Sequence, residues 1–177
     1  MSLLSGKEKL APIPSFNTII RGFWGGSISI FILLILGKLT NHLWIMAPFG
    51  ATCVILYTVA QSPLAQPRNV IFGHFISAFI GMCFLKIFGV NFLSIAFSVG
   101  GAIALMQFFR CVHPPAGANP LVILLTANTF HYEWSFLALP VLLGAIVLVL
   151  VAYCVNNFKT ESKWPTYGLA LWKSKSE

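Results

Sequence analysis

The chain alternates between long apolar runs and short stretches of polar or helix-breaking residues. Several runs approach the roughly 20 residues that an α-helix needs to cross a bilayer. Two are shorter and begin at prolines, within WIMAPFGA and HPPAGA. The pattern predicts six membrane segments, at about 19–36, 44–60, 69–88, 91–109, 114–127 and 135–156. We expect an all-α integral membrane protein, with a compact helical bundle at 19–156 between tails at 1–18 and 157–177.

The two short segments have similar starts. Each begins with a proline, which is favoured in the first turn of a helix. The residue before a proline avoids helical geometry, so Ala47 and His113 should be extended and both helices should begin inside the membrane. PFGAT and PAGAN share the pattern Pro-x-Gly-Ala followed by a small polar residue. Because each short helix is the middle one of three segments, the pattern predicts a 3+3 inverted repeat.

An inverted repeat brings the amino-terminal ends of the two short helices together near the midplane of the membrane. A helix start exposes unpaired N–H groups and the positive end of the helix dipole, so two facing starts favour an anion. Thr52 and Asn119 would add side-chain donors. His74 and His113 would contact the anion or a proton, or alternatively make structural hydrogen bonds. The expected substrate-binding residues are Phe49, Gly50, Ala51, Thr52, Ala116, Gly117, Ala118, Asn119, His113 and His74.

Composition and charge support this interpretation. The chain is 58% hydrophobic and 8% charged, whereas soluble domains carry about 25% charged residues. The net charge of +7 does not indicate nucleic-acid binding, because the basic residues lie at the ends of apolar runs. All four acidic residues fall in tails or a loop. A cation or proton carrier usually needs an intramembrane carboxylate, and an anion carrier does not.

The basic residues also predict an orientation. Of the eleven Lys and Arg residues, only Lys38 and Lys86 fall on the side away from the termini. The positive-inside rule therefore places both termini in the cytoplasm, and we expect a bacterial cytoplasmic (inner) membrane. Arg68 and Arg110 should anchor helix ends at the cytoplasmic interface and draw anions toward the site.

Other positions predict packing and helix ends. Rows of small residues should form seams between helices, and several glycine seams are compatible with a homo-oligomer. Asn69 is expected to cap the third segment. Aromatic and apolar residues of the tail (Trp164, Tyr167, Leu171 and Trp172) would lie on the membrane surface. The rows are Gly22/Gly26, Gly73/Ser77/Gly81 and Ala96/Gly100/Ala104.

Three motifs carry a resemblance to a known family. RCVHPPAGANP at 110–120, APFGA at 47–51, and SPLAQPRN at 62–69 followed by Gly73-His74 resemble the HPP family of integral membrane proteins. The match covers roughly residues 17–156. Plastid and cyanobacterial relatives in this family are associated with nitrite transport. The resemblance implies that this chain moves nitrite or a similar small monovalent anion. The family is often described as having four spanning helices, and the present count adds the two short ones.

The sequence leaves two other functions open. A membrane-embedded enzyme could use Cys111 and His113 as a nucleophile and base, although no carboxylate lies nearby to orient the histidine. A structural or assembly subunit would explain the seams but not two matched short helices. We expect no cofactor and no metal, since the cysteines and histidines lack the spacing of a metal site. The expected partners are a small inorganic anion and the lipid bilayer, with no nucleic acid.

Overall fold

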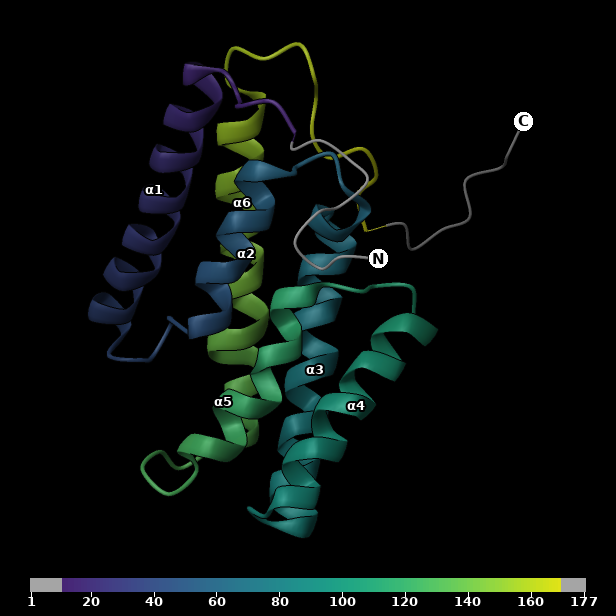
Figure 1. Cartoon of the computed structure of the whole chain (residues 1–177). Helices are drawn as coiled ribbons and strands as arrows, with labels where there is room; N and C mark the ends of the chain where they lie inside the picture. The colour runs from purple at the N-terminus through teal and green to yellow at the C-terminus, as the bar shows by residue number, and fades with distance from the viewer. Residues whose placement is uncertain (1–10, 170–177) are drawn as a thin grey trace.

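The computed structural model describes residues 11–169, and within that range the chain is helical and contains no strand. Each of the six predicted segments corresponds to one α-helix, so the all-α membrane fold is confirmed (Figure 1). The helices are α1 (Phe16–Thr40), α2 (Ala47–Thr58), α3 (Pro67–Phe88), α4 (Phe92–Phe108), α5 (Asn119–Thr126) and α6 (Leu143–Asn157).

Short helical turns precede several of these helices. A 3₁₀ turn, η1 (Pro63–Ala65), leads into α3, and η2 (Pro114–Ala118) leads into α5. The 3₁₀ turn η3 (Trp134–Leu137) and the π-helical turn η4 (Ala138–Leu142) continue into α6. Within residues 11–169, three helical stretches are long and apolar enough to cross a bilayer, namely α1, α3 and the run Trp134–Asn157.

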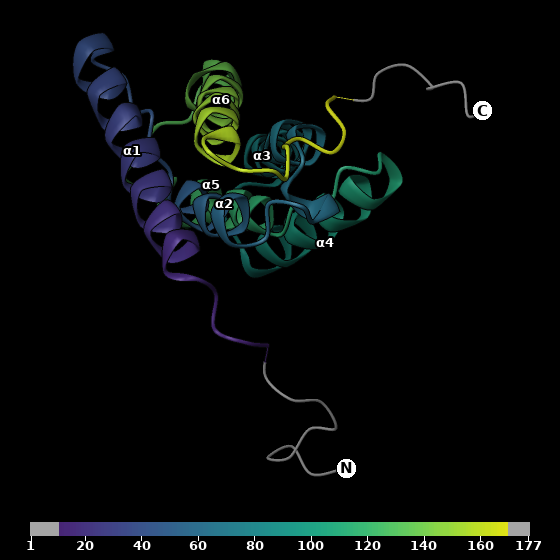
Figure 2. The same cartoon turned by 90° about the horizontal axis from the view of Figure 1, so that it is seen from above.

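The chain reverses direction from each helix to the next. The start of α1 and the end of α6 lie at one end of the bundle, here called the terminal end (Figure 1). Seen from above, α2 and α5 project onto one another between α1 and α4, with α3 and α6 alongside (Figure 2). Both short helices begin at middle height and run in opposite directions, so their amino-terminal ends face each other (Figure 1). The internal symmetry of a 3+3 inverted repeat stays a prediction.

The starts of the short helices differ in detail from the expectation. At α5, His113 is extended (φ −135°, ψ 102°), as expected for a residue before Pro114. At α2, the extended residue is Met46 (φ −136°, ψ 144°) rather than Ala47, which is the first residue of the helix. The second short helix is also not α-helical from its start. The successive prolines Pro114 and Pro115 begin a 3₁₀ turn, and the α-helix follows only at Asn119.

The small-residue row of α3 packs as predicted. A Cβ added at Gly73 would lie 2.8 Å from His113 Cβ, and one added at Gly81 would lie 2.9 Å from Pro120 Cα. Between them, Ser77 donates a hydrogen bond to the Ala116 carbonyl. This row lets α3 lie directly against the loop at 110–113, η2 and α5, and thereby places His74 beside them.

The predicted rows on α1 and α4 do not pack within the chain. A Cβ added at Gly22, Gly26 or Gly100 would meet nothing within 4 Å. On α1 it is Gly25 that lies against a neighbour, the Tyr57 ring of α2. On α4 the buried positions are Ser94, Ser98, Ala102 and Met106. Each lies two residues along the helix from a member of the expected row. Four-residue spacing alone did not identify which of the parallel rows on a helix faces the bundle.

The segment after α6 folds back onto the terminal end of the bundle. Trp164 is only 1% exposed and belongs to the hydrophobic core, so its expected place on the membrane surface is wrong. Its backbone is held because Asn157 bonds both the N–H and the carbonyl of Trp164. The Thr166 N–H donates to Gln66 Oε1, and the Tyr167 hydroxyl donates to Asn69 Oδ1. The expectations for Leu171 and Trp172 lie outside the described residues.

Candidate functional site

Four polar side chains meet where the two short helices approach each other. They are Thr52 of α2, His74 of α3, His113 of the 110–113 loop and Asn119 of α5, and each is 0% exposed. His74 lies seven residues after Pro67, so it is about 10 Å along α3 from the terminal end. All four were expected from the sequence as site residues, and the fold brings them into one buried cluster.

Thr52 is the centre of this polar cluster. Its hydroxyl oxygen is 2.7 Å from His74 Nε2 and 2.9 Å from His113 Nε2. The same oxygen is 3.1 Å from the Pro48 carbonyl one turn earlier in α2. Thr52 therefore connects one ring from α3 with one ring from the 110–113 loop.

Each histidine also bonds outward from the centre. His113 Nδ1 lies 2.8 Å from the Leu64 carbonyl oxygen of η1. Asn119 Nδ2 lies 3.2 Å from His74 Nδ1 and donates to the His74 carbonyl across 3.0 Å. The two imidazole rings are 5.1 Å apart between centroids. The side-chain oxygen of Asn119, Oδ1, is buried and has no hydrogen-bond partner.

The backbone at the helix starts only partly matches the expectation of open donors. The N–H of Phe49 donates to the Met46 carbonyl, and that of Ala116 donates to the His113 carbonyl. These two N–H groups are therefore engaged, because the extended residue that precedes each helical turn, Met46 or His113, accepts from the first turn with its carbonyl. The Phe49 side chain instead packs its ring edge against His74, with centroids 5.0 Å apart.

The glycines and alanines that follow lie differently on the two helices. Gly50 and Ala51 are exposed on the outer face of α2, while Gly117 and Ala118 are half-buried. A Cβ added at Gly50 or Gly117 would meet nothing within 4 Å. Both glycines therefore leave open space beside the helix starts, as a ligand approaching the backbone would need.

The two arginines lie at the terminal end, as predicted. Arg68 donates to the carbonyls of Phe109 and Leu169, each across 2.9 Å. Arg110 is exposed and has a left-handed backbone (φ 55°) at the start of the 110–113 loop. Arg68 thus holds the end of α4 and the segment after α6 together. Its expected effect on anions stays a prediction.

Asn69 does not cap α3, because the helix begins two residues earlier, at Pro67. Its side chain instead donates to the Val112 carbonyl across 2.8 Å. Asn69 therefore links α3 to the loop that carries His113, and Tyr167 closes over it from outside.

The alternative pairing of Cys111 with His113 is not supported. Both ring nitrogens of His113 lie within hydrogen-bond distance of other groups, Leu64 O and Thr52 Oγ1. Cys111 is fully buried at the other end of the 110–113 loop. A nucleophilic thiol needs a free base beside it and access to substrate. Neither condition is met in this conformation.

Sequence reasoning missed three groups of the cluster's surroundings. Two are the backbone carbonyls of Pro48 and Leu64, which no side-chain pattern identifies. The third is Ser77, whose hydroxyl bonds the Ala116 carbonyl across 2.5 Å. Ser77 lies three residues after His74 on the same face of α3, so helical spacing could have pointed to it.

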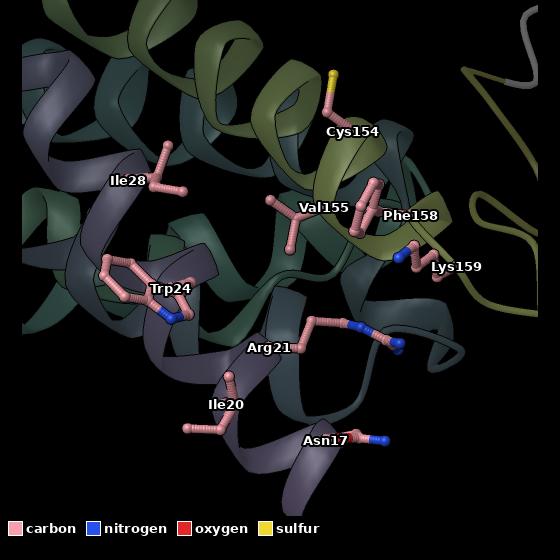
Figure 3. A pocket seen from close by; sticks show the side chains of 9 residues that line it. All are labelled: Asn17, Ile20, Arg21, Trp24, Ile28, Cys154, Val155, Phe158 and Lys159. Carbon is pink, nitrogen blue, oxygen red and sulfur yellow. The ribbon is translucent and has the colours of Figure 1, made fainter.

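A separate groove lies between α1 and α6 at the terminal end, with a volume of about 580 Å³ (Figure 3). Two cationic side chains, Arg21 and Lys159, are among those that line it (Figure 3). None of its lining residues belongs to the polar cluster, so the groove is not part of the candidate site. It is lined by Asn17, Ile20, Arg21, Trp24, Ile28, Cys154, Val155, Phe158 and Lys159.

Comparison with known proteins finds one matching family model and two related proteins. The model of the HPP transmembrane region matches residues 11–165. A transmembrane protein of Dictyostelium discoideum is 36% identical over 172 residues, covering 92% of this chain and 60% of that protein. A second transmembrane protein of the same organism is 31% identical over 129 residues, covering 71% of this chain and 42% of that protein. The chain thus spans less than two thirds of the length of these relatives. No solved structure matches.

Proposed function

Because the chain belongs to the HPP family of transmembrane proteins, we propose that its polar cluster is the binding site of a transporter or channel for a small monovalent anion. Nitrite is the first candidate substrate, from the plastid and cyanobacterial members that the sequence motifs resemble. The protein itself is an integral membrane protein that crosses the bilayer several times.

The observation that carries the proposal is the position of the cluster. Thr52 and His113 meet at 2.9 Å, where α2 and η2 begin inside the bundle. Buried polar groups at this depth are costly in a membrane protein and usually mark the path of a substrate or ion. Transporters commonly bind anions where two broken helices point their positive amino-terminal ends at each other.

The distribution of charge supports an anion over a cation. In the described part of the chain the carboxylates are Glu133 and Glu161, and both lie in connecting segments outside the helices. Glu8 and Glu177 lie outside the described residues. A cation in the bundle would therefore find no carboxylate there. We propose that Arg68 and Arg110 attract anions to a cytoplasmic entrance at the terminal end.

The residues that we propose to contact the anion are those expected from the sequence. Thr52, His74, His113 and Asn119 supply the polar side chains. The backbones at Gly117 and Ala118 are the open part of the second helix start, and Phe49 packs against His74. Gly50 and Ala51 lie on the exposed outer face of α2, and Ala116 accepts a hydrogen bond from Ser77, so their contacts with the anion stay predictions.

Influx into liposomes tests the function. Purified protein is reconstituted, and nitrite entry is followed by a reporter inside the vesicles. Gly117→Leu fills the open space at the start of the second short helix, and we expect it to reduce influx at least about tenfold. Gly22→Leu, which also meets open space but lies on α1, is the matched control and should transport like the parent.

Empty liposomes must be measured in parallel, because nitrous acid crosses lipid unaided. Influx of nitrite, formate, nitrate, bicarbonate and chloride that never exceeds this background, in protein shown to be folded, would refute the transport proposal. Equal loss in Gly117→Leu and Gly22→Leu would instead refute the location of the site.

A further inference from the structure

The outer hydrogen bonds of the polar cluster fix where its hydrogens lie. His113 Nδ1 is 2.8 Å from the Leu64 carbonyl, which can only accept, so Nδ1 carries the hydrogen. Asn119 Nδ2 donates to the His74 carbonyl, which fixes the orientation of the amide. The second N–H of Nδ2 is directed to His74 Nδ1, so that nitrogen accepts. A neutral His74 therefore carries its hydrogen on Nε2, and a neutral His113 on Nδ1.

Thr52 completes a chain of donors that runs in one direction. His74 Nε2–H donates to Thr52 Oγ1 across 2.7 Å. The Thr52 hydroxyl then donates to the remaining lone pair of His113, on Nε2, across 2.9 Å. Each member thus donates to the next, in the order Asn119, His74, Thr52 and His113. His113, the last member, donates to the Leu64 carbonyl. Every polar hydrogen of these four side chains is used, so the neutral cluster has no donor left for an anion.

The Thr52 hydroxyl has a second acceptor within reach, the Pro48 carbonyl at 3.1 Å. If His113 gains a proton on Nε2, that N–H donates to Thr52 Oγ1 and the hydroxyl turns to Pro48. Thr52 Oγ1 then accepts from both rings and donates once, which uses its two lone pairs and its one hydrogen. The cluster can therefore hold one additional proton, and the Thr52 hydroxyl, released from His113, is the donor that can turn from Pro48 to a bound anion.

Among residues 11–169, no other group around the cluster can balance the charge of an anion. The elements packed against it present Phe49, Leu64, Ser77 and Ala116, which carry no charge. Arg68 is bonded to carbonyls at the terminal end, and Arg110 is exposed there. Other titratable side chains on these elements and on the 110–113 loop are Cys53, Tyr57, Cys83 and Cys111, which are neutral at pH 7, and Lys86, which lies in the last turn of α3, away from His74.

We propose that the cluster binds a small anion together with one proton, which makes the protein an electroneutral proton–anion carrier. This proposal rests on the proposed function and adds that a proton is transported together with the anion. A bare anion in a low-dielectric interior without a compensating charge is strongly disfavoured. The proton resides on His113 Nε2, or it stays on the acid, whose O–H then donates to the unpaired Oδ1 of Asn119. Both routes carry one proton per anion and no net charge.

Proteoliposomes distinguish such a carrier from a channel. Nitrite influx is measured under a pH gradient with the membrane potential held at zero by valinomycin and K⁺, and then under a potential without a pH gradient. We expect the pH gradient to drive influx, the potential to have no effect, and a pH dye to report one proton per nitrite. Empty liposomes give the background in each case.

Variants at Thr52 test the role of the hydroxyl. Thr52→Val keeps the shape of the side chain but cannot link the two rings, and it should reduce influx driven by the pH gradient at least about tenfold. Thr52→Ser should regain the proton-driven influx that Thr52→Val loses. Ser98→Ala removes a buried hydroxyl of α4 that bonds only within its own helix, and it should behave like the parent.

A second measurement determines which ring nitrogens carry hydrogens, and it does not depend on transport. Nitrogen NMR of ¹⁵N-histidine-labelled protein in lipid, assigned with His74→Gln and His113→Gln, should show the hydrogen of His74 on Nε2 and that of His113 on Nδ1. The exposed residues His42 and His131 supply reference signals.

The outcomes separate the two proposals. Influx that follows the membrane potential, with no proton uptake, refutes proton coupling and leaves anion transport intact. The reversed tautomer on either ring refutes the chain of donors. No influx above background for any anion refutes the proposed function itself, and the coupling falls with it.

Discussion

Gly73 is the residue at which the fold of the 110–113 loop depends most directly on the absence of a side chain. A Cβ there would lie 2.8 Å from His113 Cβ and 3.0 Å from the Cys111 carbonyl oxygen. The first distance is shorter than real Cβ atoms show, and the second involves backbone that cannot simply rotate away. Gly73 therefore allows α3 to approach the loop closely enough for His74 and His113 to share Thr52.

We expect Gly73→Ala to push the 110–113 loop away from α3. Overpacking of this kind costs about 1–3 kcal/mol of stability. Thermal unfolding in detergent should show a lower midpoint than the parent, and nitrite influx should fall with it. Gly100→Ala adds the same methyl group where nothing lies within 4 Å, and its midpoint should not fall, because Ala favours the helix. Equal midpoints for both variants would contradict the close contact.

At the level of elements, the segment after α6 is part of the bundle rather than an appendage. Trp164 is 1% exposed and packs in the core, while Trp24 on α1 is 56% exposed. Tyr167 and Arg68 then connect this segment to Asn69 and to the carbonyls that end α4. The terminal end above the polar cluster is therefore closed by residues that follow the last membrane helix.

Trp164→Ala tests this packing. Removing a buried tryptophan costs about 3–5 kcal/mol, because it loses burial and leaves a cavity. The unfolding midpoint in detergent should drop markedly. Trp24→Ala should change it little, since that side chain faces outward. Similar small effects of both substitutions would show that the segment is not anchored in the core.

The elements also show how far sequence alone reaches. Apolar runs and prolines located all six helices and the two short ones that begin at middle height of the bundle, because these features depend on local backbone chemistry. The same reasoning named Thr52, His74, His113 and Asn119, since polar residues in apolar runs are conspicuous. It failed where the outcome depends on contacts between elements. Trp164 belongs to the hydrophobic core although it lies in a polar and basic segment, and Asn69 bonds a loop rather than its own helix.

At the scale of the whole molecule, one face between α1 and α4 exposes the outer side of the short helices (Figure 2). Gly50 and Ala51 lie on it, near the point where α2 begins. A twelve-residue helix is about 18 Å long, so its start lies well inside a hydrocarbon core of about 30 Å. Irregular backbone at that depth is not tolerated against lipid and needs protein or water beside it.

We therefore predict that a second copy of the chain covers this face. Particles in lipid nanodiscs should contain more than one 19.4-kDa chain. Ala51→Trp, which places a large side chain on the face, should shift them to single chains. Leu93→Trp, at an exposed position on α4, should leave the assembly unchanged. Parent particles that contain one chain would contradict the prediction.

The packing of Trp164 has a consequence for biosynthesis. A chain is made from its amino terminus, and its parts fold as they emerge from the ribosome. Because α6 ends at Asn157, a chain cut off there would contain all six membrane helices but lack the Trp164 side chain that completes the core. A reporter fused directly after Asn157 would sample that open state, whereas one fused after residue 169 would report the closed bundle.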